Sequence, residues 1–546
     1  MEEPQQSLSH LIIDDFEQMR VSIKGMLTAY GARDITTCPS GEKALKLLAH
    51  NSYDVVLCDY NLGEGKDGQQ VLEEAKHLGY LGHAATFIMV TAENNMPMVM
   101  SALEHQPDDY MVKPINRDVL HHRLTAALSR KRKLKEIDEA LIQNEKLSAI
   151  DLCRKNSEND PKQRLYLAKL QAELCLEIKY LDEAEKIYRE ILEIRNFPWA
   201  RFGLCKIDFL KGNHERAERG FRELIKQNHR YIEVYDWLVR LLLERGGDEE
   251  GQQLLQEAVK LSPKAVARQR RLGIIAEKNG DIERAERALQ AAIRWGKNSC
   301  FATAQEYRCL ANIYQNSGRS AKIARLLNEG RRRFSCQPAD YIQLLCAQAL
   351  VQQYQGESLD LKRYLDEVVQ LVDDHKRELT ADDLLRCADD LFQLSRDDEA
   401  QKLLKLVLSN HHDDESWVER VSQLMLRHGC DREVDGLVSH VRSELQQIHV
   451  KCTELLRRDK LKQAITLLNN TIDCYPRNRT LMLMAAGAMI NFMRVNGLEP
   501  SYHFRCRFSL NRLLERDRQD IDAGRFLTML NKIVPSAAEE SIDGKS

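Results

Sequence analysis

Three carboxylates, a hydroxyl and an amine in the first part of the chain have the types and spacing for phosphoryl chemistry beside a metal ion. They belong to Asp14, Asp15, Asp59, Thr91 and Lys113. Three converging carboxylates repel one another and favour a hard divalent cation, and Mg²⁺ suits oxygen ligands. A carboxylate beside such an ion can attack phosphorus and form an acyl phosphate. The lysine and the threonine would then neutralise charge on the transferring phosphoryl oxygens.

Each of these residues lies just beyond the end of a short run that is typical of a buried β-strand. Strands are expected at residues 11–13, 35–37, 53–58, 86–90 and 110–112. Helical spacing of apolar residues separates them, including helices at 41–49, 69–78 and 97–105 and one from about residue 116. This alternation predicts an α/β doubly wound domain with a five-stranded parallel sheet. The polar residues are expected to meet at the carboxyl edge of that sheet, where ligands bind in open α/β folds.

Residues 10 to about 130 resemble the receiver domain of two-component response regulators. The matching features are the acidic pair after the first strand, Asp59 after the third, Thr91-Ala92 after the fourth and Lys113-Pro114 after the fifth. The intervals of 44, 32 and 22 residues from Asp15 through Asp59 and Thr91 to Lys113 are close to the usual spacing of that family. The resemblance implies a flavodoxin-like fold.

The same resemblance implies a role for each residue at this edge. Asp59 would be the phosphoacceptor, and Mg²⁺ would be held by Asp14, Asp15, Asp59 and the backbone carbonyl of Asn61. Thr91 and Lys113 would contact the phosphoryl group. Thr91 and Tyr110 would rearrange on activation, with Tyr110 as the aromatic side chain that changes rotamer.

Beyond residue 130 a helical repeat replaces the strand pattern. Small residues recur at equivalent turns, namely Ala149, Ala184, Ala217, Gly251 and Ala285. They are separated by 35, 33, 34 and 34 residues, and a period near 34 with helix–turn–helix content resembles the tetratricopeptide repeat. We therefore expect a receiver at 1–130, an all-α superhelical solenoid of this repeat type at 131–533, irregular in its second half, and a disordered tail at 534–546. Such a solenoid presents a concave groove for peptides or helices.

The junction between the two parts is predicted to be rigid. The helix from about Asn116 continues into the first repeat without Gly or Pro, whereas a flexible linker is rich in Gly, Ser or Pro. This pattern indicates that the receiver docks on the first repeat.

Composition excludes several classes of protein. The chain has 80 Lys and Arg against 83 Asp and Glu, which argues against a nucleic-acid binder. The basic runs 130–133 and 331–333 are each a single helical turn and are interpreted as solvated faces. The run 411–414 of two His and two Asp falls in a predicted turn and is interpreted as a solvated loop.

The start of the chain does not resemble a signal peptide, and no apolar run reaches the length of a membrane helix. We therefore expect no membrane insertion and a cytoplasmic location.

These observations predict a response regulator that is not an enzyme. A histidine kinase or histidine phosphotransfer protein would phosphorylate Asp59, and phosphorylation would control binding of an unknown protein ligand in the groove of the repeats. The alternatives are a pseudo-receiver that serves as an unphosphorylated scaffold or adaptor, a transcription regulator, and an enzyme with a receiver switch. A transcription regulator needs a DNA-binding module after residue 130, and none is recognisable there.

Overall fold

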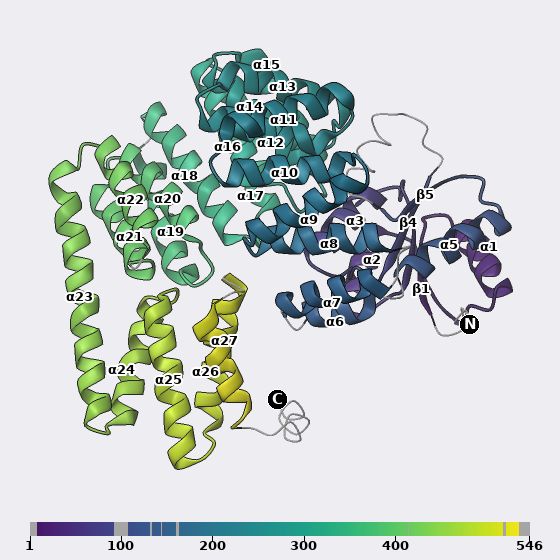
Figure 1. Cartoon of the computed structure of the whole chain (residues 1–546). Coiled ribbons are helices and arrows are strands. Elements are labelled where there is room, and N and C mark those ends of the chain that lie inside the picture. Colours follow the sequence, from purple (N-terminus) through teal and green to yellow (C-terminus); the bar gives the residue numbers. More distant parts are fainter. Residues whose placement is uncertain are drawn as a thin grey trace. The chain divides into compact units, whose positions relative to one another are not determined.

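The computed structural model describes residues 8–91, 107–131, 134–142, 145–159, 163–356, 358–412, 414–516 and 520–533. The helix expected at 97–105 and the tail expected at 534–546 lie outside these residues. The chain divides into two compact units, with the division between Ile313 and Tyr314. A parallel sheet with its helices begins the chain (purple in Figure 1), and helices make up the described remainder.

The sheet has five parallel strands, as the sequence predicts, and their order is β2-β1-β3-β4-β5. Its strands are β1 (Ser9–Ile13), β2 (Asp34–Cys38), β3 (Val55–Asp59), β4 (Thr86–Thr91) and β5 (Asp109–Val112). In the register of the sheet, Asp59 lies beside Val90 and Thr91 lies beside Val112. The carboxyl ends of β3, β4 and β5 are therefore level, which brings their terminal side chains to one edge.

Helices cover both faces of this sheet because alternate strand residues point to opposite sides. They are α1 (Glu17–Ala29), α2 (Gly41–His50), α3 (Gly68–His77) and α5 (Arg117–Lys131). Leu11 and Ile13 of β1 pack in the core beneath α2 and α3. Ile12, between them, packs in the core beneath α1 and α5. Every central strand is thus anchored from two sides, which fixes the positions of the loops at the carboxyl edge.

The rest of the described chain is a helical array, which runs from α6 to α27. Its helices are α6 (Lys135–Ile142), α7 (Lys146–Asn159), α8 (Arg164–Glu177), α9 (Leu181–Ile194), α10 (Pro198–Leu210), α11 (His214–Gln227), α12 (Ile232–Glu244), α13 (Asp248–Leu261), α14 (Val266–Lys278), α15 (Ile282–Gly296), α16 (Ala304–Asn316), α17 (Ser320–Arg333), α18 (Pro338–Gln355), α19 (Ser358–His375), α20 (Ala381–Gln393), α21 (Asp397–Asn410), α22 (Glu415–Arg427), α23 (Asp431–Arg457), α24 (Leu461–Cys474), α25 (Arg479–Asn496), α26 (Pro500–Arg516) and α27 (Ile521–Asn531). The apolar run at 480–493 lies in α25, a core helix. In the part of the chain that the structure describes, no helix has the length and apolar character to cross a membrane.

Helix pairs in the first unit repeat at a nearly constant interval. The turn after the first helix of each pair contains one residue with a positive φ, namely Lys179, Gly212, Gly246 and Gly280. Their φ angles are between 60° and 80°, a region that glycine enters at little cost. The small anchor residues of the sequence repeat are all buried, so the paired helices can approach closely. The regular helix pairs agree with the predicted period, while the assignment to a named repeat family rests on the sequence resemblance.

The α/β domain is joined to the array by a carboxylate in the first array helix. Asp138 of α6 is buried and accepts hydrogen bonds from the backbone N–H groups of His83 and Ala84, at 2.8 and 2.5 Å. A Cβ on Gly82 would lie 2.7 Å from an oxygen of Asp138, so this turn approaches α6 as closely as a glycine allows. Residues 132–133 of the predicted rigid junction lie outside the described ranges. The contact at Asp138 supports docking of the α/β domain on the first array helices.

Candidate functional site

The loop after β1 holds two aspartates in place through its backbone. Asp14 accepts a hydrogen bond from the backbone N–H of Phe16 at 2.9 Å, through its Oδ1. Arg20 of α1 donates to the carbonyl oxygens of Asp14 and Asp15, at 2.7 and 3.0 Å. The guanidinium therefore engages the backbone and leaves both carboxylates directed to the edge of the sheet.

Asp14, Asp15 and Asp59 form an acidic cluster at this edge. Their carboxylate oxygens lie within 4.8 Å of one another, and no other group of three His, Cys, Asp or Glu residues with this geometry occurs among the described residues. Asp14 and Asp59 are buried, and Asp15 is half-buried. The Oδ1 atom of Asp15 is itself buried and accepts no hydrogen bond within the described part of the chain. A buried anionic oxygen of this kind requires a cation, so the residues present fit Mg²⁺.

Lys113 brings a positive charge into the cluster. Its ammonium group lies 2.9 Å from Asp14 Oδ2 and 2.8 Å from Asp59 Oδ2. Burial raises the pKa of Asp59, while the hydrogen bond from Lys113 opposes that rise. Burial alone would lower the pKa of Lys113, but its hydrogen bonds to Asp59 and Asp14 raise that pKa above its ordinary value. The lysine thus stays charged and neutralises part of the negative charge on Asp59 and Asp14.

The other predicted residues lie around this cluster. Thr91 is the last residue of β4 and is buried, and its carbonyl accepts from the backbone N–H of Lys113 at 2.7 Å. The backbone N–H of Asn61 donates to the Asp59 carboxylate. Tyr110 of β5 is half-buried and packs against the core under α2 and α3. The structure thus places the three aspartates, Asn61, Thr91 and Lys113 at one edge, whereas Tyr110 lies within β5 beside Met89. The roles of these residues in phosphoryl transfer remain predictions.

Helix α3 begins directly against the backbone of Asp59. Asp67 caps the helix: its side chain accepts from the backbone of Gln70, whose side chain accepts from the backbone of Asp67. The next residue, Gly68, donates to the carbonyl of Tyr60 at 2.8 Å. A Cβ at Gly68 would lie only 2.1 Å from the Asp59 carbonyl oxygen, so no larger residue fits without a shift of the backbone. The start of α3 therefore has to follow any displacement of Asp59.

Sequence reasoning did not single out Tyr60, Asp67 or Lys264, although these residues join the β3–α3 loop to the array. Tyr60 and Asp67 flank the glycine-containing loop on its two sides. Lys264 follows a proline in the turn between α13 and α14 and bonds to Asp67. A proline at this place is typical of a helix end, and no local pattern connects that turn to a residue 197 positions away.

Removing the charge of Asp15 is expected to weaken Mg²⁺ binding. Asp15→Asn keeps the shape of the side chain but takes one negative charge from the cluster, so the affinity for Mg²⁺ should fall by about tenfold or more. Isothermal titration calorimetry of the full chain with Mg²⁺ measures this change. Asp34→Asn, on an exposed strand position, is the control and should bind Mg²⁺ as the parent chain does. Equal affinities for the two variants would contradict the assignment of Asp15.

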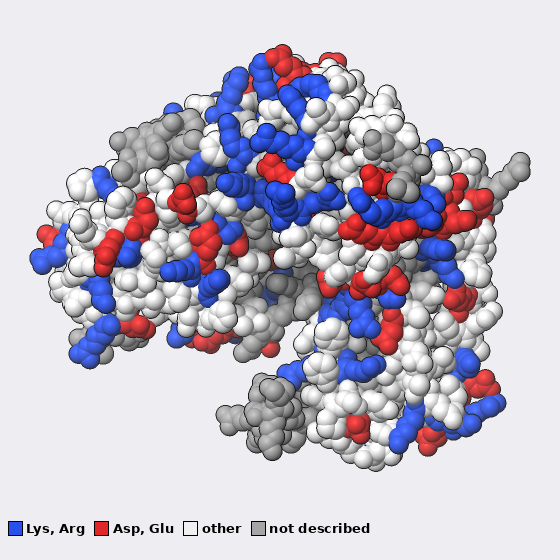
Figure 2. Space-filling view, turned by 180° about the vertical axis from the view of Figure 1, so that it is seen from behind, with Lys and Arg blue, Asp and Glu red and all other residues white. Residues whose placement is uncertain are grey.

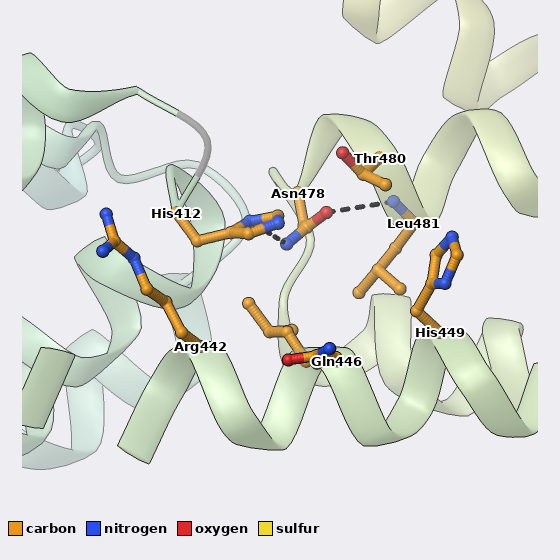
Figure 3. Close-up of a pocket in the computed structure, with 8 residues that line it drawn as sticks. His412, Arg442, Gln446, His449, Asn478, Thr480 and Leu481 are labelled. Atoms are coloured by element: carbon orange, nitrogen blue, oxygen red, sulfur yellow. Dashed lines mark hydrogen bonds between the residues drawn. The ribbon is translucent and has the colours of Figure 1, made fainter. Parts of the chain in front are cut away.

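A cavity in the second unit is a less suitable site. It has a volume of about 180 Å³ and lies between α23 and the start of α25. Figure 3 shows His412 and Asn478 directed toward each other, and Asn478 accepting from the backbone of Leu481. Arg442 is paired with Glu415. These polar groups already have partners within the fold, so we interpret the cavity as a packing gap between helices. His412 has a structural role there. Asp413 lies outside the described residues.

Comparison with known proteins finds relatives of the α/β domain. The response regulator receiver domain family matches residues 11–125. The transcriptional regulatory protein AfsQ1 of Streptomyces coelicolor is 36% identical over 122 residues, which are 22% of this chain and 52% of AfsQ1. The chemotaxis protein CheY of Pseudomonas aeruginosa is 30% identical over 120 residues, which are 22% of this chain and 95% of CheY.

Solved structures include similar domains. A receiver domain of a Francisella response regulator has 26% sequence identity, covers 23% of this chain and 98% of its own, and has a TM-score of 0.21. This chain spans about half the length of AfsQ1 and nearly the whole of CheY. Through the α/β domain that carries the acidic cluster, the chain belongs to the response regulator receiver family.

Proposed function

We propose that Asp59 accepts a phosphoryl group from a histidine kinase or a histidine phosphotransfer protein. The observation that carries this proposal is the position of Asp59: it lies within 4.8 Å of two further carboxylates and 2.8 Å from the ammonium group of Lys113. A carboxylate in such surroundings can act as a nucleophile toward phosphorus, because nearby positive charge stabilises the transferring oxygens.

The proposed transfer is a simple displacement at phosphorus. An oxygen of Asp59 forms the new P–O bond, and the P–N bond to the donor histidine breaks with return of a proton to the imidazole. Lys113 and the Thr91 hydroxyl would contact the phosphoryl oxygens. Mg²⁺, held by Asp14, Asp15, Asp59 and the carbonyl of Asn61, would supply charge neutralisation. Water later cleaves the acyl phosphate and restores the carboxylate.

The proposed output is a change in what the helical array binds. Stacked helix pairs bury their apolar faces against their neighbours and present an extended surface that suits a protein partner. We propose that the protein acts in the cytoplasm, where histidine kinases expose their phosphodonor domains.

The test is phosphorylation of the full chain by a small donor. Acetyl phosphate with Mg²⁺ replaces the kinase, so the experiment requires no knowledge of the cognate partner. One acid-labile phosphate per chain is expected, and peptide mapping should place it on Asp59. A chain that takes up no phosphate would instead support the scaffold or adaptor alternative.

We expect no salt-sensitive binding of the full chain to duplex DNA. Strong electrostatic binding to DNA requires a concentrated basic surface. Figure 2 shows acidic side chains beside the basic ones on the face that it draws. Two of the arginines in the run 331–333 lie over aromatic rings, Arg331 over Tyr364 and Arg333 over Phe334. Fluorescence anisotropy with a labelled duplex at low and moderate salt measures binding. A dissociation constant below about 1 μM at low salt that weakens steeply with salt would contradict this prediction.

A further inference from the structure

The β3–α3 loop of the receiver is held by residues of the array. These contacts lie within the first compact unit. Lys66 donates to the carbonyl of Asn298 at 2.6 Å, and the Asn298 side chain donates to the carbonyl of Gly65. Further along α3, the rings of His77 and Phe301 lie 5.0 Å apart. The loop that follows Asp59 is therefore also a docking surface for the array.

Lys264 is the central residue of this docking surface. Its ammonium group lies 2.8 Å from Asp67 Oδ2 and 4.7 Å from the centre of the Tyr60 ring. The same group hydrogen-bonds with the Tyr60 hydroxyl and lies 5.5 Å from the ring centre of Trp295 in α15. Its side chain is only 14% exposed. One array lysine thus contacts residues on both sides of the loop, between an aromatic ring of the receiver and one of the array.

This lysine depends on the loop for its charge partners. Burial alone would lower the pKa of Lys264, but the charge of Asp67 and the hydrogen bonds to Asp67 and Tyr60 raise that pKa. A buried cation that loses its anionic partner is strongly destabilised. The contact is therefore formed only while Asp67 and Tyr60 hold their present positions.

A short and rigid connection links those positions to Asp59. Tyr60 is the next residue in the chain and is buried. Asp67 is the cap of α3, and the following Gly68 packs against the Asp59 carbonyl with no space for a Cβ. In the present arrangement Asp59 is paired with Lys113 and accepts from the backbone of Asn61. A phosphoryl group on Asp59 adds three oxygens and would take Lys113 as a partner, so the present bonds of the carboxylate to Lys113 and to the Asn61 backbone must change and the loop has to readjust.

We propose that the Lys264 contact couples phosphorylation of Asp59 to docking of the array. The contact stabilises the loop arrangement in which Lys113 is paired with Asp59, and it opposes phosphorylation. Phosphorylation in turn weakens the contacts of Lys264 with Asp67 and Tyr60. This proposal rests on the proposed function of Asp59. By linkage, release of the array from the loop must favour phosphorylation to the same extent that phosphorylation favours release.

The test compares initial rates of phosphorylation by acetyl phosphate and Mg²⁺ in full-length variants. Lys264→Met keeps the length of the side chain and its contact with Trp295 but removes the charge. Its rate should exceed that of the parent chain by about fivefold or more, because a larger fraction of molecules would already have the released loop that accepts phosphate. Lys260→Met, on an exposed position of α13, is the matched control and should keep the parent rate. Circular dichroism checks that each variant is folded.

A double-mutant cycle with Asp67→Asn shows whether the effect runs through the ion pair. The asparagine still accepts from Gln70 at the helix cap, so α3 keeps its start. Both single variants should be faster than the parent, and the double variant no faster than the faster single one. Equal or lower rates in Lys264→Met, or fully multiplicative effects in the double variant, would overturn the coupling while labelling of Asp59 remained. Absence of labelling in every variant would overturn the proposed function and this inference together.

Discussion

Asp59→Asn is expected to take up no acid-labile phosphate from acetyl phosphate under conditions in which the parent chain takes up one per molecule. The amide nitrogen and oxygen of asparagine cannot replace the carboxylate as nucleophile, so the loss should be complete and not partial. Intact-mass spectrometry before and after acid treatment measures the phosphate directly. The substitution is nearly isosteric, so the buried edge of the sheet should keep its packing.

The control for this experiment is another acid of the same loop. Glu64 is exposed and lies between Asn61 and Asp67, and Glu64→Gln should be labelled as the parent chain is. Labelling of Asp59→Asn at the parent level would show that another residue is the phosphoacceptor. Loss of labelling in both variants would indicate that the loop, and not the carboxylate at position 59, governs the reaction.

Lys113→Met is expected to bind Mg²⁺ more tightly than the parent chain while accepting phosphate more slowly. The ammonium group of Lys113 lies within 2.9 Å of Asp14 and of Asp59, which are also the predicted ligands of the ion. Removing this competing positive charge should raise the Mg²⁺ affinity by about tenfold or more. The same change removes the cation that would stabilise the transferring phosphoryl oxygens, so the rate of labelling should fall.

The opposite directions of these two effects make the result diagnostic. Lys46→Met, at an exposed position of α2, is the control and should change neither quantity. Calorimetry gives the Mg²⁺ affinity, and the initial rate of acetyl phosphate labelling gives the second quantity. A variant with weaker Mg²⁺ binding would show that Lys113 supports the ion site and does not compete with the ion. A variant with unchanged labelling would contradict the role of Lys113 in the transfer.

The acidic cluster could be predicted from the sequence because its geometry follows from strand ends. Parallel strands finish at one edge, and Asp59, Thr91 and Lys113 each stand at or just beyond a strand end. The residues that fill the two cores also follow from alternation along each strand, as Leu11, Ile12 and Ile13 show. In each case a local pattern fixes the position of a side chain.

The contacts between receiver and array could not be predicted in this way. Lys264 and Asp67 are separated by 197 residues, and their contact depends on the summed geometry of several helix pairs.

At some positions of the array the residue type does not indicate the local structure. Lys179, Ser395 and Asp459 adopt positive φ at turns where glycine would be expected, because the surrounding helices determine the backbone there. The 27-residue length of helix α23 interrupts the regular pairs.

The carboxylate of Asp138 limits how freely the receiver can be exchanged between proteins. It belongs to the first array helix, yet it satisfies two backbone N–H groups of the receiver and contacts a turn in which a Cβ at Gly82 would crowd the carboxylate. A receiver cut off at the end of α5 would leave those groups without their acceptor. A foreign receiver placed before α6 would have to offer a matching turn, or Asp138 would be buried without donors. Evolution of this chain by exchange of its first domain is therefore restricted to receivers that already carry that turn.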